Sequence, residues 1–334
     1  MLRLGKILVT VHHYSDESNC FMIGRFLRRW PVAHYLLYNA FFNYYHKKLV
    51  NNYYFDFPEF TMLLQHFLAF TILEIMRSLR CAEIPNYVFV RSVRYAALPS
   101  VCFIAYLWVS NGKVFSSQYP QYEMVKRLEP YFWLLIQMFV VRIRLKKRWV
   151  SRGQRTAFHV VVVATVLACI YPPWRGLDYV SWVDGLTASV YQLAFMYTAR
   201  NAMKRFEITE LDMLYMITVH ACGVHLIQDY RRNSGMGAMH FLQHSYVPRA
   251  MLGFWPAFLV VLITPLRMQH LLLRTLAADQ MHLLVLFGGV KAMFSPIMGD
   301  FVFHCFLLDP ILGLHNYAGM AVAVLGSIVY VKSM

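Results

Sequence analysis

The sequence predicts an all-α integral membrane protein with about ten transmembrane helices and with both termini in the cytosol. The first supporting observation is composition: 58% of the 334 residues are hydrophobic, 15% are charged, and the mean hydropathy is +0.43. A soluble domain of this length has no need of so apolar a chain. The second is the recurrence of apolar segments long enough to cross a bilayer. The third is the distribution of basic residues over alternate loops.

The apolar segments give the helix count. A spanning helix needs about 20 mostly apolar residues, because the hydrocarbon core is about 30 Å thick. In chain order the candidate spans cover residues 30–46, 59–78, 93–110, 120–142, 157–173, 179–199, 210–228, 249–266, 282–307 and 314–332. Several are short or are interrupted by proline, glycine or a charge. We predict a cytosolic N-terminal arm over residues 1–29 and a single membrane domain over 30–334.

The basic residues test this count, because cytoplasmic loops carry an excess of Lys and Arg. With the N-terminus in the cytosol, most of the 32 basic residues fall on the cytosolic side, most densely over residues 142–155. Both termini then lie on that side. The net charge of +15 invites a nucleic-acid interpretation. Cations dispersed over alternate loops do not form the single basic surface that nucleic acid requires, so no nucleic-acid partner is predicted.

Two lysines in apolar surroundings, Lys126 and Lys291, are the principal candidate site residues. A charge at membrane depth is costly and marks a functional site by default. The chain divides into halves of five spans, 30–173 and 179–332, and each lysine falls in the fourth span of its half. Such repeats build many transporters, and paired cations in a low-dielectric cavity suit an anion such as phosphate. The alternatives are that Lys126 snorkels to a headgroup and that Lys291 pairs with Asp300.

Three further residues are candidate substrate contacts. Tyr122 lies one helical turn before Lys126 and offers a ring for stacking on a nucleobase or sugar. Lys47 and Arg200 are candidate anion contacts. Each has a structural alternative, which is packing between helices for Tyr122 and a headgroup contact for Lys47 and Arg200.

The residues around Lys126 carry a family resemblance. Residues 122–132 place Glu-Pro and an aromatic residue three positions after the lysine. This resembles the fourth-span pattern of the nucleotide-sugar and triose-phosphate transporters of the drug/metabolite transporter superfamily, in which that lysine reaches the substrate's phosphate. The resemblance implies two five-helix inverted repeats, and it implies phosphate binding by Lys126 and Lys291. An empty cavity with two cations should resist reorientation until an anion neutralises it, which predicts obligatory exchange of phosphorylated substrates.

Other segments extend the resemblance over nearly the whole chain. Residues 287–330 are similar to the family's last two spans, and 182–215 to its sixth and seventh. The C-terminal landmarks are Gly288, Lys291, Gly299, Asp300, Phe301, Asn316, Gly319, Gly326 and Tyr330. Lys47, Pro58 and Gln65 fit the first part of the family's pattern at familiar spacing. Small residues such as Gly326 are expected to let membrane helices approach closely.

Departures from the family pattern guide the choice of substrate. Lys291-Ala292 stands where triose-phosphate members have Lys-Arg, and Tyr215-Met216-Ile217 stands where some nucleotide-sugar members have base-recognising asparagines. We therefore predict exchange of a cytosolic nucleotide sugar for a luminal nucleoside monophosphate in the Golgi or endoplasmic reticulum membrane. A sugar-phosphate/phosphate exchanger is the alternative. The interpretation requires no cofactor and no metal, and it leaves a homodimer open.

Two other classes compete with a transporter. His220, His225, His240 and His244 cluster in sequence, and a His-x-x-x-His pair can bind metal, but the boxes of membrane oxygenases are absent, so hydrogen-bonded histidines are favoured. Catalytic elbows and phosphate-binding loops are also absent, and no enzyme is predicted. A non-transporting scaffold is the remaining alternative. It does not explain the retention of two intramembrane lysines.

Overall fold

Helices make up nearly all of the residues that the computed structural model describes, and no strand occurs among these residues. The structure describes residues 31–86, 88–110, 152–169 and 179–280, and toward the C-terminus 283–284, 315, 318–319, 321–322, 325–326 and 329. The predicted all-α class is confirmed for this part of the chain.

The helix bounds mostly follow the predicted spans. The helices are α3 (Pro31–Asn51), α4 (Pro58–Ser78), α5 (Phe89–Ser110), α8 (Arg152–Cys169), α9 (Tyr179–Phe206), α10 (Glu210–Arg232), α11 (Ser234–His244), α12 (Tyr246–Ala250) and α13 (Phe254–Ala277). Among the described residues, α4, α5 and α13 are the three helices long and apolar enough to cross a membrane. Three predicted spans lie wholly or mostly outside the described residues. They are 120–142, 282–307 with the exception of residues 283–284, and most of 314–332.

The largest difference between prediction and structure lies before and within α13. The sequence predicts a span over 249–266, whereas the helix runs from Phe254 to Ala277, and two short helices that were not predicted precede it. A hydropathy segment stops at the first charge, here Arg267. The backbone hydrogen bonds of a helix do not stop there, because Leu, Met and Arg all favour helix.

Local sequence sets where the central helix α10 begins and ends. The Thr209 side chain accepts a hydrogen bond from the backbone N–H of Asp212 at 3.2 Å, which caps the first turn. Glu210 and Asp212 place negative charge at the positive end of the helix dipole. Asn233 then ends the helix in the left-handed region, with φ of 51°.

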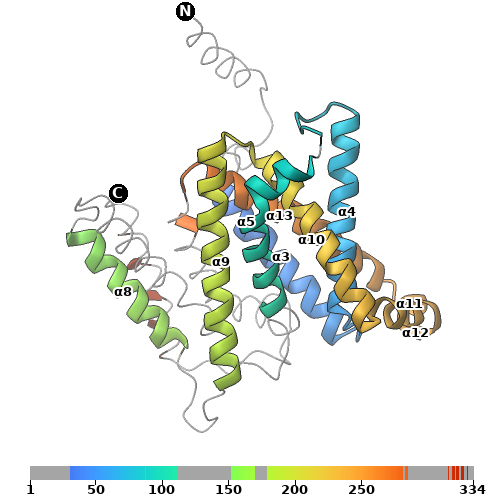
Figure 1. The fold of residues 1–334 in the computed structure, drawn as a ribbon. Helices are drawn as coiled ribbons and strands as arrows, with labels where there is room; N and C mark the ends of the chain where they lie inside the picture. The colour runs from blue at the N-terminus through green and yellow to red at the C-terminus, as the bar shows by residue number, and fades with distance from the viewer. Residues whose placement is uncertain are drawn as a thin grey trace, which may run out of the picture.

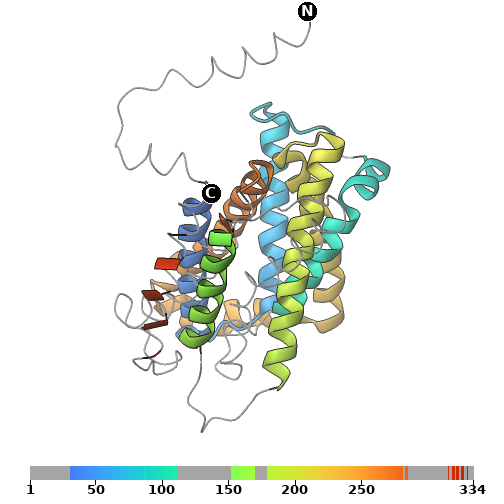
Figure 2. The ribbon, with the colours of Figure 1, turned by 90° about the vertical axis from the view of Figure 1, so that its left-hand side faces the viewer.

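Three antiparallel helix pairs form the bundle. In the α5–α9 pair, Phe103 contacts Phe195 and Tyr95 contacts Phe206, with ring centroids 5.1 and 4.4 Å apart. Figure 2 shows the long α9 lying alongside α5. The α3–α13 pair is equally extensive, and its core packs Tyr53, just past α3, onto Phe254 at 5.7 Å. The third pair, α4–α10, lies between them.

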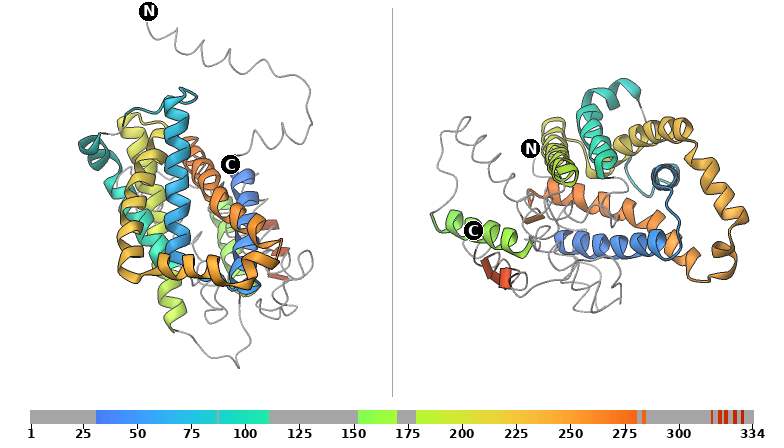
Figure 3. Two further views of the ribbon diagram at one scale, coloured as in Figure 1. Left: turned by 90° about the vertical axis from the view of Figure 1, so that its right-hand side faces the viewer. Right: turned by 90° about the horizontal axis from the view of Figure 1, so that it is seen from below.

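Two parallel contacts join these pairs, since α4 packs along α13 and α5 along α10. The chain passes from α10 to α13 through α11 and α12, which run around the outside of α4 (Figure 3, right). α8 lies on the opposite side of the molecule from α11 and α12 (Figure 1). Gly326 packs against α8 so closely that an added Cβ would lie 2.8 Å from Val161 Cγ2. The close approach predicted for Gly326 is therefore confirmed.

The core has two parts. A large cluster fills the bundle from α3 Val32 to α13 Leu276. A second cluster, here called the aromatic end cluster, lies where α3 ends and where α4 and α13 begin. Its rings are Tyr53, Phe55, Phe57, Phe241, Phe254 and Phe258. Edge-to-face contacts between such rings add to the energy of apolar burial.

A proline explains one interhelical hydrogen bond. Pro265 lies in the middle of α13 and has no N–H, so the carbonyl of Val261, four residues earlier, has no partner within the helix. The Gln65 side chain of α4 donates to that carbonyl at 3.0 Å, and the contact is buried. Gln65 thus satisfies an acceptor that the proline leaves open.

We expect Gln65→Leu to leave the Val261 carbonyl unpaired and to destabilise the protein by about 1–3 kcal/mol. Pro265→Ala supplies an N–H four residues after Val261, so Gln65→Leu should cost less in the Pro265→Ala background. Apparent melting temperatures of the four proteins in detergent would complete the double-mutant cycle. Equal losses in both backgrounds would contradict this role of Gln65.

Candidate functional site

The described residues contain only part of the predicted site. Lys126, Lys291 and Tyr122 lie outside them, so phosphate binding by the lysines and stacking by Tyr122 stay predictions. Lys47 and Arg200 are described. Lys47 is half-buried near the end of α3, beside the aromatic end cluster that Leu49 enters.

Arg200 lies near the end of α9 and makes an ion pair with Asp279, just beyond α13. Lys204 donates to the same carboxylate at 2.8 Å. Arg200 and Lys47 lie toward opposite ends of the bundle. Arg200 lies near the end of α13, which packs with the start of α3 in the large cluster. Lys47 lies near the end of α3, which packs with the start of α13 in the aromatic end cluster. The structure does not bring these two predicted anion contacts together.

Asp279 lies outside the helices and is half exposed. Burial would raise the pKa of its carboxyl, but the hydrogen bond from Lys204 and the charges of Arg200 and Lys204 hold that pKa below its usual value. A depressed carboxyl pKa adds stability above the pKa of the unfolded state. That stability is lost as the pH falls through the lower, folded pKa.

Asp279→Asn should therefore lower the apparent melting temperature by a similar amount at pH 7 and pH 6. Below about pH 4, where the Asp279 carboxyl of the unfolded chain begins to be protonated, the difference should shrink. Glu83→Gln, at an exposed loop carboxyl, is the matched control and should have little effect. A difference that widens on acidification would contradict the assignment.

A dense set of polar side chains lies where α10 meets α4 and α5, and we call it the α10 polar interface. Its members are Glu59, His66, Glu74, Arg91, Ser92, Ser100, Asp212, Tyr215, His220, His225 and Arg232. Polar side chains inside a membrane domain are costly, and those that occur face the bundle interior and pair with one another. This interface therefore is the candidate functional site of the described residues.

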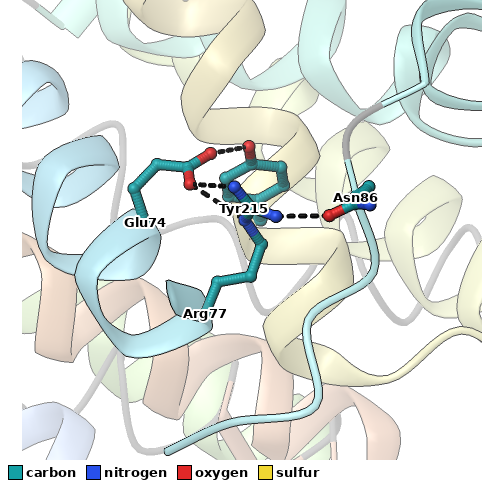
Figure 4. A network of polar contacts seen from close by, with 4 residues as sticks. All are labelled: Glu74, Arg77, Asn86 and Tyr215. Carbon is teal, nitrogen blue, oxygen red and sulfur yellow. Dashed lines mark hydrogen bonds and ion pairs between the residues drawn. The ribbon is translucent and has the colours of Figure 1, made fainter. Parts of the chain in front are cut away.

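At one end of the interface, Asp212 is almost fully buried and pairs with Arg91 of α5 at 2.5 Å. Nearby, both carboxylate oxygens of Glu74 are occupied (Figure 4). The Tyr215 hydroxyl donates to one oxygen, and Arg77 donates to the other from Nε at 2.9 Å and Nη2 at 2.7 Å. Arg77 also donates to Asn86 in the loop before α5, so the network ties α4, α10 and that loop together.

In the middle of the interface, His220 lies between two hydroxyls of α5. Ser92 Oγ is 2.8 Å from Nε2, and Ser100 Oγ is 2.8 Å from Nδ1. A neutral imidazole donates from one nitrogen and accepts at the other, and a hydroxyl can do either, so both contacts are satisfied. The prediction that His220 is a hydrogen-bonded histidine is confirmed.

Four more of the described histidines form two pairs. His240 and His244 lie on one face of α11 with ring centroids 4.6 Å apart, as their spacing predicted. His66 and His225 face each other between α4 and α10, at 5.0 Å. Within the described part of the chain, no three His, Cys, Asp or Glu residues gather closely enough to hold a metal ion.

Sequence reasoning missed Glu74, Arg91 and Asp212 as site residues. A signal was present, since Glu74 lies inside the predicted span 59–78 and Asp212 inside 210–228. The default for an ionisable residue in a span is a functional site, and that default was applied only to the two lysines. In the sequence, Tyr215 belongs to the segment that stands where some family members have base-recognising asparagines, and nothing there indicates its contact with Glu74.

Comparison with known proteins supports the fold alone. No protein-family model and no curated protein matches the chain. A solved structure described only as "Crystal structure of protein" resembles it with a TM-score of 0.59, covering 91% of this chain and 96% of that chain at 11% identity. These findings define an all-helical protein in which three helices of the described part of the chain are long and apolar enough to cross a membrane.

Tyr215→Phe should destabilise the protein by about 1–2 kcal/mol, because it removes a hydrogen bond to a carboxylate. Tyr230→Phe is the matched control: Tyr230 lies on the same helix, but its side chain is 82% exposed. Apparent melting temperatures in detergent check both. Equal effects of the two substitutions would contradict the Glu74–Tyr215 contact.

Proposed function

We propose that this chain is a ten-helix antiporter, built from two inverted five-helix repeats, that exchanges a cytosolic nucleotide sugar for a luminal nucleoside monophosphate. The observation that carries the proposal is the pattern of helix packing. In this scheme α3, α4 and α5 are the first three spans of one repeat, and α9, α10 and α13 are the first three spans of the other.

An inverted repeat exchanges equivalent spans, so each helix contact should have a counterpart. Exchanging α3 with α9 and α5 with α13 converts the extensive antiparallel pair α3–α13 into the extensive antiparallel pair α5–α9. Exchanging α4 with α10 converts the parallel contact α4–α13 into the parallel contact α5–α10. The α4–α10 pair maps onto itself, whereas the smaller contacts α10–α13 and α9–α13 have no counterpart of similar extent. This pattern supports a pseudo-twofold axis that passes through the α10 polar interface.

Prolines support the same equivalence. Pro99 lies in the middle of α5 and Pro265 in the middle of α13, and both are buried. These two helices are the third spans of their repeats. In transporters with inverted repeats, interrupted helices at corresponding positions of the two halves are the best sequence pointer to the substrate site.

Charge supports the membrane orientation. Arg77, Arg91, Arg200 and Lys204 lie at the end of the bundle where α4 and α9 finish and α5 and α10 begin. Under the positive-inside rule this end faces the cytosol. Both termini are then cytosolic in a chain of ten spans, and the aromatic end cluster faces the lumen.

The substrate rests on the family resemblance and on the chemistry of its residues. Lys126 and Lys291, one from each repeat, bind the phosphates, and Tyr122 stacks on the base or sugar. A doubly cationic empty cavity resists reorientation in a low-dielectric membrane, so exchange is obligatory. The membrane is that of the Golgi or the endoplasmic reticulum.

Counterflow in proteoliposomes preloaded with mixed nucleoside monophosphates tests the proposal. We expect saturable uptake of one labelled nucleotide sugar that depends on internal nucleotide. Lys126→Ala and Lys291→Ala should each reduce uptake at least tenfold, because each removes a charged contact to phosphate worth more than about 1.4 kcal/mol. Lys6→Ala, in the N-terminal arm, is the control and should leave uptake unchanged.

Other outcomes separate the alternatives. Uptake of sugar phosphates in place of nucleotide sugars would identify a sugar-phosphate/phosphate exchanger. A well-folded protein that exchanges no phosphorylated solute would overturn the transport proposal and favour a membrane scaffold.

A further inference from the structure

A pair of histidines, His66 of α4 and His225 of α10, lies buried at the centre of the α4–α10 contact. Their ring centroids are 5.0 Å apart, and the planes are tilted by 36°. His66 is 2% exposed and His225 is fully buried. His66 lies eight residues into α4, about 12 Å along the helix axis from Pro58 at about 1.5 Å per residue. The pair is thus well inside the bundle.

Both rings are held through Nδ1. His66 Nδ1 lies 2.8 Å from the Met62 carbonyl oxygen, which only accepts, so this nitrogen carries the hydrogen. His225 Nδ1 lies 2.9 Å from Gln228 Oε1, also an acceptor. In the neutral rings each Nε2 therefore presents a lone pair.

Both Nε2 atoms are buried, and neither has a hydrogen-bond partner among the described residues. Buried polar atoms are nearly always paired, so two orphaned acceptors on neighbouring rings indicate a missing donor. A positive charge on one ring opposes a second charge on the other. The chemistry therefore suits one cation and not two.

Glu59 of α4 is the neighbouring charged group that favours a cation at His225, whereas burial of both rings opposes one. Glu59 also pairs with Arg232, and one oxygen of Asp229, one helical turn after His225, is buried and unpaired. From α5 the neighbour is Phe103, whose ring meets His66 at 6.0 Å. From α13 the neighbouring polar contact is Gln65 to the Val261 carbonyl.

We propose that His66 and His225 together bind one proton, taken from the luminal side, and that this proton couples nucleotide exchange to pH. A proton from hydronium in the luminal solution forms an N–H bond at one Nε2 and leaves a water molecule, and the second Nε2 accepts from that N–H directly or through one water. The pair passes from neutral to a single positive charge. Proton binding stands on the histidine geometry alone, whereas the coupling rests on the proposed exchange function.

Nitrogen NMR of ¹⁵N-histidine-labelled protein in nanodiscs, with chelator present, tests proton binding. Between about pH 4.5 and 8 we expect the Nε2 signals of His66 and His225 to shift together in one event that adds a single proton. Asn keeps a donor near the Nδ1 position and removes Nε2, so His66→Asn or His225→Asn should abolish the shared event. His159→Asn, at an exposed position on α8, should leave it intact.

Two results would overturn proton binding: signals from both rings that do not move in folded wild-type protein, and two independent titrations. The titration is repeated without chelator, and a shift that occurs only without chelator would identify a bound metal instead of a proton. The wild-type titration decides the matter even if a variant fails to fold.

Counterflow at varied luminal pH then tests the coupling. We expect wild-type initial rates to change at least threefold between pH 5.5 and 7.5, and both histidine variants to exchange without that dependence. Rates independent of pH in a protein whose NMR shows the shared proton would overturn the coupling alone. Absence of all exchange would overturn the proposed function, with the NMR result standing separately.

Discussion

Polar groups inside a bundle that crosses a bilayer need partners within the protein, because the bilayer core offers no water. Most polar side chains where α10 meets its neighbours have such partners, whereas the Nε2 atoms of His66 and His225 find none among the described residues. Asp212 is paired by Arg91, and His220 is held by two serines. Gln65 supplies the donor that the Val261 carbonyl lacks because of Pro265. These contacts determine which faces of the helices lie against one another, and apolar side chains pack around them.

The two kinds of helix contact differ in specificity. The α3–α13 and α5–α9 pairs are joined mainly through apolar and aromatic surfaces, which accept small shifts in register. The α4–α10 pair is joined by directional contacts at both ends, from Glu74–Tyr215 to Glu59–Arg232. A shift of one residue would break each of these, because hydrogen bonds weaken steeply with distance and angle. The polar pair therefore sets the register of the bundle.

Hydropathy predicted the helices well and their partners poorly. The predicted spans 59–78, 93–110 and 210–228 coincide closely with α4, α5 and α10, because an apolar stretch of that length has few other outcomes in a membrane. The end of α13 was missed, since charged residues continue a helix that hydropathy no longer follows. The short helices α11 and α12 were missed because a search for membrane spans does not find helices of 11 and 5 residues.

The candidate site was harder to predict because its contacts join residues far apart in the chain. Glu74 and Tyr215 are 141 positions apart, and Arg91 and Asp212 are 121 apart. A sequence shows that each is costly in a membrane, but the partner that makes it tolerable depends on the fold. Arg200 shows the opposite case. The sequence indicates a cation available for an anionic substrate, whereas in the structure Arg200 makes an ion pair with Asp279.

The polar contacts between α4 and α10 constrain how the bundle can move. The ion pair Glu59–Arg232 joins the two helices at one end, and the hydrogen bond from Tyr215 to Glu74 joins them at the other. Breaking both contacts at once leaves more polar groups unpaired than breaking either one, and each unpaired buried group is costly. Any opening along this pair is therefore cheapest at one end at a time, with the buried histidines between the ends and the apolar pairs intact.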